Sequence, residues 1–287
     1  MPASVAEPAG VLSLEIVSRG GKSVATRQYH EDALRVLRPH YLDCNGQVTY
    51  TVINPGGAYF GADTYELDFS VAEEAELTLT TQSATKVYKT PQGPAIQNMR
   101  IRVAGNGVFE YLPDQLIVYR QGAYRQHTLV QMAPSSTVVL AEIMTPGWSP
   151  TGEDFHYDEL SMRTEIQVIQ DGTMRRLAVD RLRIKPHELT GLSGMGMMEG
   201  FTHTGQLLIA DARLSESLFG RILELLEESS TRSGLTRAGT DQGFGVKCWC
   251  VRSLAHSTSE LMDLQHRIVN EIRASTRGQN PLNLRKN

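Results

Sequence analysis

The sequence predicts a mainly β protein with two α-helices near its C-terminal end. Most of the first 210 residues alternate apolar and polar side chains with a period of two, which places alternate side chains on opposite faces of a strand. Glycine and asparagine pairs interrupt this alternation at regular points, as tight turns require. Two later segments instead space their apolar residues three or four apart, which is typical of amphipathic helices.

The strand pattern repeats along the chain and is clearest at Tyr65, Leu67, Phe69 and Val71. Around Asp171-Gly172, the segments "RTEIQVIQ" and "TMRRLAVDRLRI" have the form of two arms of one hairpin. No repeat of fixed length is visible in the residues. The alternation alone therefore suits a sandwich, a barrel or a stacked β-coil.

The two predicted helices cover residues 211–229 and 257–275. The first carries Leu214, Leu218, Ile222 and Leu226 at four-residue intervals, and each helix needs a partner surface for its apolar stripe. The second helix opens with Ser257 and Glu260 at capping-box spacing. The glycine- and methionine-rich run from 190 to 206 lacks periodicity, and we expect a long loop there.

Composition excludes several classes of protein. The 287 residues leave one large domain or two ordinary ones open. A net charge of -4 and a pI near 6.1 argue against a nucleic-acid partner, which needs an excess of Lys and Arg. No basic leader and no run of about 18 apolar residues is present, so we expect no membrane association. Three cysteines make no disulfide framework, and we expect a cytoplasmic protein.

Familiar catalytic motifs are absent. Gly194, Gly196 and Gly200 have the wrong spacing for a dinucleotide fingerprint. Cys248 and Cys250 in "KCWC" invite a soft-metal interpretation, but on a strand their thiols would lie about 6.5 to 7 Å apart along the backbone. A second cysteine pair that could complete a four-ligand site is missing. We therefore expect these thiols to pack in or near the core.

Carboxylates are the remaining candidates for chemistry. Asp63 follows a glycine-rich turn, and Glu142 lies within the apolar strand "TVVLAEIM". Glu153 belongs to an acidic cluster around His156. A glutamate inside an apolar strand carries a desolvation cost unless it is paired with a cation or metal. The alternative is that Glu142 lies on the solvated face of its strand.

Five blocks in order, taken together, resemble the urease accessory protein UreD family, called UreH in some systems. The blocks are "NPGGAYFGADTYELDFSV", "LTTQSATKVYKT", "EYLPDQLIVYRQGAYRQHTLVQMA", "LAEIMTPGWSPTGEDFHYDELSMRTEI" and "VDRLRI". The resemblance runs from about residue 12 to about 275. One departure is Ala62, which stands where the family often has the middle glycine of a Gly-Gly-Asp turn ending at Asp63.

The resemblance implies a single domain over 1–287, with a helically coiled β-rich body (1–210), a helix-containing part (211–275) and a tail (278–287). It also implies a scaffold rather than an enzyme, one that binds the urease apoprotein and recruits UreF, which holds the GTPase UreG. No cofactor would be tightly bound, and nickel would be a transient cargo, conducted through an internal tunnel. We assign Asp63 and Glu142 to that path, because carboxylates can pass a divalent ion without trapping it.

Within the second block, Thr85, Lys86 and Tyr88 match the family motif. They lack the partners of a nucleophile or base, so we expect them to face a partner protein or to line the passage; an idle surface lysine is the alternative. The Met-rich residues 195–198 and the apolar stripes of the two helices are candidates for docking UreF, with ordinary core packing as the alternative for the stripes.

Two other functions remain open from the residues. A β-coil carbohydrate-active enzyme would use Asp63 with Glu142 or Glu153, and it would need an exposed groove with two carboxylates about 5 to 10 Å apart. A nickel-storage protein would hold the ion through Cys248, Cys250 and nearby histidines, and it would need clustered ligands.

Overall fold

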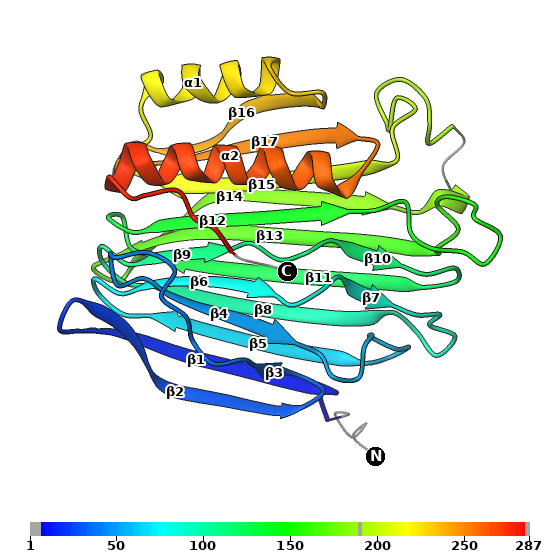
Figure 1. Cartoon of the computed structure of the whole chain (residues 1–287), viewed down its shortest axis with the longest axis horizontal. Coiled ribbons are helices and arrows are strands. Elements are labelled where there is room, and N and C mark those ends of the chain that lie inside the picture. The colour runs from blue at the N-terminus through cyan, green and yellow to red at the C-terminus, as the bar shows by residue number, and fades with distance from the viewer. Residues whose placement is uncertain (1–6, 189–190, 285–287) are drawn as a thin grey trace.

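Two β-sheets lie face to face, and the chain passes back and forth between them. The computed structural model describes residues 7–188 and 191–284. In Figure 1 the strands are stacked from the N-terminal end at the bottom to the C-terminal end at the top, where the two helices lie. The strands of the first sheet, called sheet A, are in spatial order β14 (Thr173–Ile184), β13 (Glu159–Gln170), β11 (Ala123–Met132), β8 (Ala95–Val103), β5 (Thr64–Val71), β1 (Gly10–Arg19) and β2 (Lys22–Asp32).

The second sheet, called sheet B, faces the inner side of sheet A. Its main path is β16 (Arg232–Asp241), β17 (Val246–Ala255), β15 (His203–Asp211), β12 (Thr137–Met144), β9 (Val108–Tyr111), β6 (Glu76–Thr81), β4 (Val48–Ile53) and β3 (Arg35–Val36). Two further short strands, β7 (Thr85–Val87) and β10 (Leu116–Val118), pair beside this path.

The central strands of both sheets run parallel, which makes the body a coil. From β4 to β13 the chain alternates between sheet B and sheet A, and equivalent residues stack on successive turns. Val71 pairs with Val103 and Val103 with Met132, so the turns are 32 and then 29 residues long. The unequal lengths explain why no fixed period is visible in the sequence. The predicted coiled arrangement of strands is confirmed.

Antiparallel strands end the coil on both sides. Strand β2 pairs with β1 at the N-terminal end, and β14 pairs with β13 as the second arm of the predicted hairpin, which is confirmed. In sheet B, β15, β17 and β16 follow β12 in antiparallel order.

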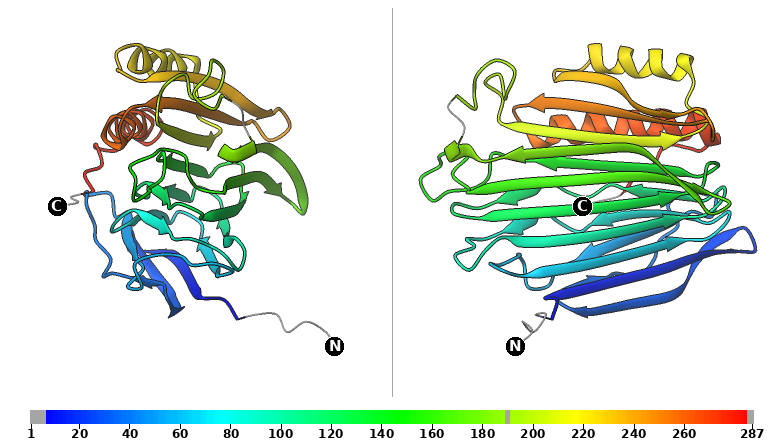
Figure 2. Two further views of the ribbon diagram at one scale, coloured as in Figure 1. Left: turned by 90° about the vertical axis from the view of Figure 1, so that its right-hand side faces the viewer. Right: turned by 180° about the vertical axis from the view of Figure 1, so that it is seen from behind.

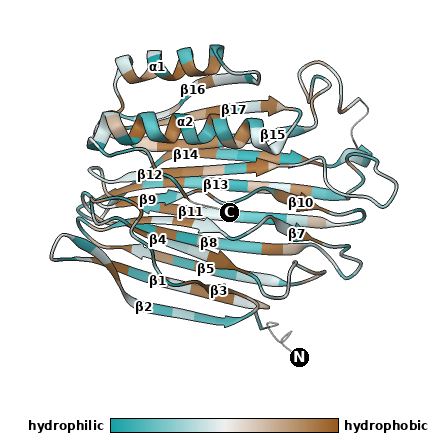
Figure 3. Ribbon diagram, viewed as in Figure 1, coloured by the Kyte–Doolittle hydropathy of each residue, from teal (hydrophilic) through white to brown (hydrophobic). Residues whose placement is uncertain are grey.

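Alternation along each strand builds the core. Figure 3 shows hydrophobic and hydrophilic segments alternating along the strands. Along β5 the side chains of Tyr65, Leu67, Phe69 and Val71 are buried between the sheets, while the intervening ones are half-buried on the outer face.

Both predicted helices form and pack on the outer face of sheet B. Helix α1 covers Glu216–Glu227 and helix α2 covers Thr258–Arg277, with Ser215 and Ser257 as N-caps. Their apolar stripes are buried against sheet B, so the hypothesis that these stripes dock a partner is wrong. Neither helix in the described residues is long and apolar enough to cross a membrane.

Two predicted boundaries need correction. The first helix begins five residues later than predicted, because β15 extends to Asp211 and residues 212–214 make the turn to the Ser215 cap. The predicted loop at 190–206 ends earlier, because β15 begins at His203. Residues 189–190 lie outside the described part. The division of the chain at residue 210 stays a prediction.

Within residues 7–188 and 191–284, no α-helix covers the outer face of sheet A. Figure 2 shows this face in its right-hand view, where α2 lies behind the strands. The short 3-10 helix η1 (Pro186–Glu188) follows β14 at the end of this sheet.

Candidate functional site

Glu142 lies inside the protein, between the two sheets. Its neighbours on β12 at two-residue spacing, Leu140 and Met144, belong to the core between the sheets, whereas Ala141 packs under the helices. Because side chains alternate along a strand, Glu142 points towards sheet A. The alternative that placed Glu142 on a solvated face is wrong.

A chain of hydrogen bonds runs from Glu142 across sheet A. The Gln126 amide of β11 donates to the Glu142 carboxylate, and the Tyr124 hydroxyl donates to the Gln126 amide oxygen at 2.9 Å. The Gln97 amide of β8 donates to the same oxygen at 3.4 Å and accepts from the Tyr59 hydroxyl at 2.9 Å. We call these five side chains the inner polar chain.

The Glu142 carboxyl has few partners that offset the cost of removing its charge from water. Burial raises its pKa to about 7, the Gln126 amide opposes this rise, and the Asp180 carboxylate of β14 adds to it. No arginine, lysine or histidine forms an ion pair with Glu142 within the described part of the chain. The carboxyl is therefore half ionised near neutral pH and has capacity for a proton or a cation.

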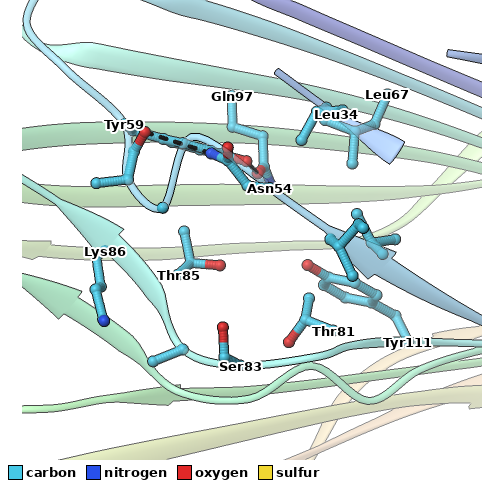
Figure 4. Close-up of a pocket in the computed structure, with 15 residues that line it drawn as sticks. Leu34, Asn54, Tyr59, Leu67, Thr81, Ser83, Thr85, Lys86, Gln97 and Tyr111 are labelled. Carbon is cyan, nitrogen blue, oxygen red and sulfur yellow. Dashed lines mark hydrogen bonds between the residues drawn. The ribbon is translucent and has the colours of Figure 1, made fainter. Parts of the chain in front are cut away.

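Two small cavities lie beside the inner polar chain. One has about 50 Å³ and is lined by residues that include Tyr59, Thr85 and Lys86. The other has about 20 Å³ and is lined by residues that include Gln126 and Glu142. Thr85, Gln97 and Tyr111 line both cavities, so the two are neighbours. Each is large enough for at least one water molecule. Figure 4 shows the larger cavity, with the Thr85 side chain between Lys86 and Tyr111.

Asp63 lies at the far end of the same region, in the turn before β5. Its carboxylate accepts hydrogen bonds from the Tyr65 hydroxyl at 2.9 Å and from the Phe60 backbone N–H at 3.0 Å. The Tyr65 ring stacks on the Tyr59 ring with centroids 3.5 Å apart. Asp63 and Glu142 are therefore connected through the inner polar chain but are not neighbours.

Thr85 and Lys86 lie on β7, which pairs in parallel with β10, and β10 in turn pairs with β12 of sheet B. Lys86 pairs with Ile117, and Thr85 pairs with Leu116. Thr85 lines both cavities, whereas Lys86 lines only the larger one. The two motif residues therefore occupy different positions relative to the cavities.

Tyr88 belongs to an exposed ladder of aromatic rings, which sequence reasoning missed. Tyr59 bridges to Val87, and Tyr119 bridges to Trp148, so successive turns place aromatic rings side by side. The ring centroids of Phe60 and Tyr88, Tyr88 and Tyr119, and Tyr119 and Trp148 are 5.5, 4.7 and 4.9 Å apart. Tyr88 is 37% exposed and Trp148 is 50% exposed. Parallel strand spacing explains the last two distances. Only the register of the coil could have revealed this ladder.

The structure does not support the soft-metal site. Cys248 and Cys250 are buried on β17, and burial raises the pKa of the Cys248 thiol to about 12 and that of Cys250 to about 11. Among residues 7–188 and 191–284 no group of three or more His, Cys, Asp or Glu residues could hold a metal ion. The prediction that both thiols are packed in the core is confirmed.

For the carbohydrate-enzyme alternative, none of the cavities and grooves described among residues 7–188 and 191–284 joins Asp63 to Glu142 or Glu153. Small-molecule sites are usually clefts of about 300 to 1,000 Å³, far larger than the two cavities beside Glu142. Glu153 is exposed, and its carboxylate interacts with the Thr151 hydroxyl at 2.6 Å and with His156 at 3.6 Å. Glu153 lines neither of the two cavities beside the inner polar chain.

Comparison with known proteins assigns the chain to a family. The model of the UreD urease accessory protein family matches residues 8–287. This chain belongs to the UreD family. Relatives in the family include the urease accessory protein UreD of Kocuria rhizophila, 53% identical over 99% of this chain and 90% of its own length. The UreD proteins of an Arthrobacter species and of Corynebacterium glutamicum are 47% and 42% identical, over 97% and 98% of this chain and 94% and 98% of theirs. The resemblance in the five sequence blocks is confirmed.

Proposed function

We propose that this UreD family member serves as a maturation scaffold that helps to insert nickel into the urease active site. The family match over residues 8–287 carries this proposal. The protein docks on the urease apoprotein and recruits UreF, which holds the GTPase UreG. Its relatives are named accessory proteins, which fits a role without catalysis. We place this work in the cytoplasm.

Nickel is a transient cargo in this proposal, and no cofactor is tightly bound. Glu142 is the central residue of the path, because its carboxyl is buried, has a pKa near 7 and has an amide rather than a cation as its partner. A divalent ion at this position replaces the proton and relieves the cost of burying the charge. A single carboxylate with neutral amides and hydroxyls around it holds such an ion weakly, which suits passage rather than storage.

Asp63 and Thr85 extend the path towards the surface. Thr85 lines both cavities and its hydroxyl can hold a water molecule at their junction. Asp63 lies beyond Tyr59 and Tyr65 and keeps a carboxylate at the outer end of the inner polar chain. Water molecules in the two cavities would let a hydrated ion exchange ligands one at a time.

Partner proteins use exposed features of the same body. Lys86 and Tyr88 lie where the larger cavity and the aromatic ladder meet, and exposed Tyr and Trp residues are common at protein interfaces. Met195 is 96% exposed, and Met197 and Met198 line a groove of about 460 Å³ beside β14 and β16. We assign this groove to UreF, because flexible methionines adapt well to a protein partner.

Urease activation in cells tests the proposal. The gene for this chain is deleted from a strain that carries the urease structural and accessory genes, then restored as wild type, Glu142→Gln or Asp63→Asn. We expect wild type to restore nickel-loaded urease. Glu142→Gln keeps the side-chain shape and the complex with UreF but lowers the nickel content of urease. Glu227→Gln, an exposed glutamate on α1, is the matched control.

Two results would contradict parts of this proposal. Full urease activity without the chain would remove the accessory role. Normal nickel loading by Glu142→Gln and Asp63→Asn, with the UreF complex intact, would leave the scaffold role and remove the path through these carboxylates.

A further inference from the structure

The outer face of sheet A carries a concentration of arginines that the inner polar chain does not use. Outward-facing positions on β8, β11, β13 and β14 hold two glutamates and seven arginines, namely Arg100, Arg102, Arg125, Arg163, Arg176, Arg181 and Arg183. We call this surface the arginine face. The whole chain has a net charge of -4, so this positive charge is local.

The two glutamates are each shared by two arginines. Glu159 accepts from Arg125 at 2.8 Å and from Arg183 at 3.3 Å. Glu165 accepts from Arg163 at 2.6 Å and from Arg176 at 3.0 Å. These hydrogen bonds lower the pKa of both carboxyls, so both stay ionised at neutral pH. Each group of three retains one net positive charge.

The remaining arginines have less compensation still. Arg102 forms an ion pair with Asp68 of β5, which also lies opposite Arg100 in the register, but in the described residues neither Arg100 nor Arg181 forms an ion pair. Arg181 lies directly opposite Arg163 on the neighbouring strand. Like charges in that position destabilise a sheet, so folding stability alone does not account for them.

Apolar side chains lie among these arginines. Arg100, Leu129, Glu165 and Val179 occupy one row across the four strands, and Val179 is 47% exposed. A surface that combines arginines with a few exposed apolar groups has the composition of a protein interface. Four strands span roughly 15 Å, and ten-residue strands span roughly 30 Å, which is ample for a contact surface.

We propose that the arginine face docks an acidic surface of a protein partner within the urease machinery. This inference rests on the proposed function, because that function supplies the partners. Arginine recognises carboxylates through two parallel hydrogen bonds, and Arg100 and Arg181 have their guanidinium donors available for this. Glu159 and Glu165 lie between the arginines and would repel a continuous phosphate backbone, which favours a protein over a nucleic acid.

Charge reversal at the two uncompensated arginines tests the docking surface. The full chain is co-expressed with the urease subunits and the other accessory proteins as wild type, as Arg100→Glu with Arg181→Glu, or as Arg19→Glu with Arg38→Glu. The last pair is exposed, lies outside the arginine face and makes the same change in net charge. The chain carries an affinity tag, and the partner proteins that are recovered with it are measured at increasing NaCl concentration. Urease activation is measured in the same cells.

We expect the reversal on the arginine face to reduce recovery of the complex by at least tenfold at physiological salt, with the control pair unchanged. Wild-type recovery should fall as salt rises. The neutral double variant, Arg100→Gln with Arg181→Gln, should reduce recovery of the complex by a smaller factor. If circular dichroism shows that the charge-reversal variant is unfolded, the neutral variant is used in its place.

Several outcomes would overturn the inference. Equal recovery and activation by wild type, the reversal pair and the neutral pair would do so while leaving the accessory role intact. Loss of heparin binding by the reversal pair, with the protein complex unaffected, would assign the face to a polyanion instead. Failure of wild type to restore urease would instead contradict the proposed function.

Discussion

Two glutamates on sheet B, Glu110 and Glu142, have opposite surroundings. Glu110 of β9 is fully buried under the C-terminal end of α2, where Arg273, also fully buried, donates to its carboxylate at 2.7 Å. Arg277, Thr78 and Gln47 also donate to this carboxylate. Burial opposes ionisation, but these partners outweigh it and the pKa of Glu110 is lowered. Glu142 of β12, the strand next to β9, has one amide partner and a raised pKa.

The difference separates a charge that is balanced inside the protein from one that is not, and it is the reason we propose Glu142 for the nickel path. The Glu110 cluster joins the last turn of α2 to the N-terminal strands, because Arg273 also contacts Asp43 at 2.6 Å. All its charges are balanced inside the protein. The Glu142 carboxyl lacks that balance, so a mobile proton or cation has to supply it.

The largest effect is expected from breaking the Glu110 cluster. Arg273→Ala leaves the buried Glu110 carboxylate without one of its two arginine partners and should lower the free energy of unfolding by about 3 to 5 kcal/mol. Urea denaturation measures this. Arg267→Ala, on the same helix, removes an exposed pair with Glu228 and should cost less than about 1 kcal/mol. Equal losses of unfolding free energy in the two variants would show that the Glu110 cluster contributes no more to stability than an exposed ion pair.

The next largest effect is the pH dependence that Glu142 gives to protein stability. The folded protein holds the Glu142 proton more tightly than the unfolded chain, so the contribution of Glu142 to stability should fall as pH rises from 4.5 to about 7. Glu142→Gln does not titrate and should gain up to about 3 kcal/mol over wild type above pH 7 and nothing below pH 4.5. Urea denaturation across this range measures the difference, with Glu227→Gln as control. A stability difference between Glu142→Gln and wild type that does not change with pH would contradict a raised pKa for Glu142.

A smaller effect is expected from nickel itself. At pH 7.5, Ni²⁺ at ten times its dissociation constant should stabilise wild type by about 1.4 kcal/mol. Glu142→Gln should lose most of this gain, whereas Glu227→Gln should keep it. Thermal unfolding with and without Ni²⁺ measures both. The same gain in all three proteins would place the binding away from the inner polar chain.

The smallest effect concerns the turn that holds Asp63. Ala62 has a φ of 62°, a left-handed conformation that costs an alanine about 1 kcal/mol. Ala62→Gly should therefore stabilise the protein by up to about 1 kcal/mol, offset in part by the greater freedom of glycine in the unfolded chain. Thermal unfolding measures it. Destabilisation would mean that the alanine methyl group makes a favourable contact.

Strand and helix type could be predicted from local pattern, whereas their ends and partners could not. The alternation at Tyr65, Leu67 and Phe69 and the cap at Ser257 are local signals, and both predictions are confirmed. The first helix begins at Glu216 rather than 211 because pairing of β15 with β12 and β17 extends that strand to Asp211. Pairing with distant strands is invisible to a local pattern.

The sequence by itself determined the β-rich class, the two helices and the buried cysteines. Five sequence blocks in order also determined the resemblance to the UreD family. Only the tertiary structure decided which face of β12 carries Glu142, and it joined Gln126, Gln97 and Tyr59 to that residue. The register of a coil with unequal turns also built the aromatic ladder and the arginine face. The physical reason is that neighbours across parallel strands are about 30 residues apart in the chain, and backbone pairing rather than local sequence sets their alignment.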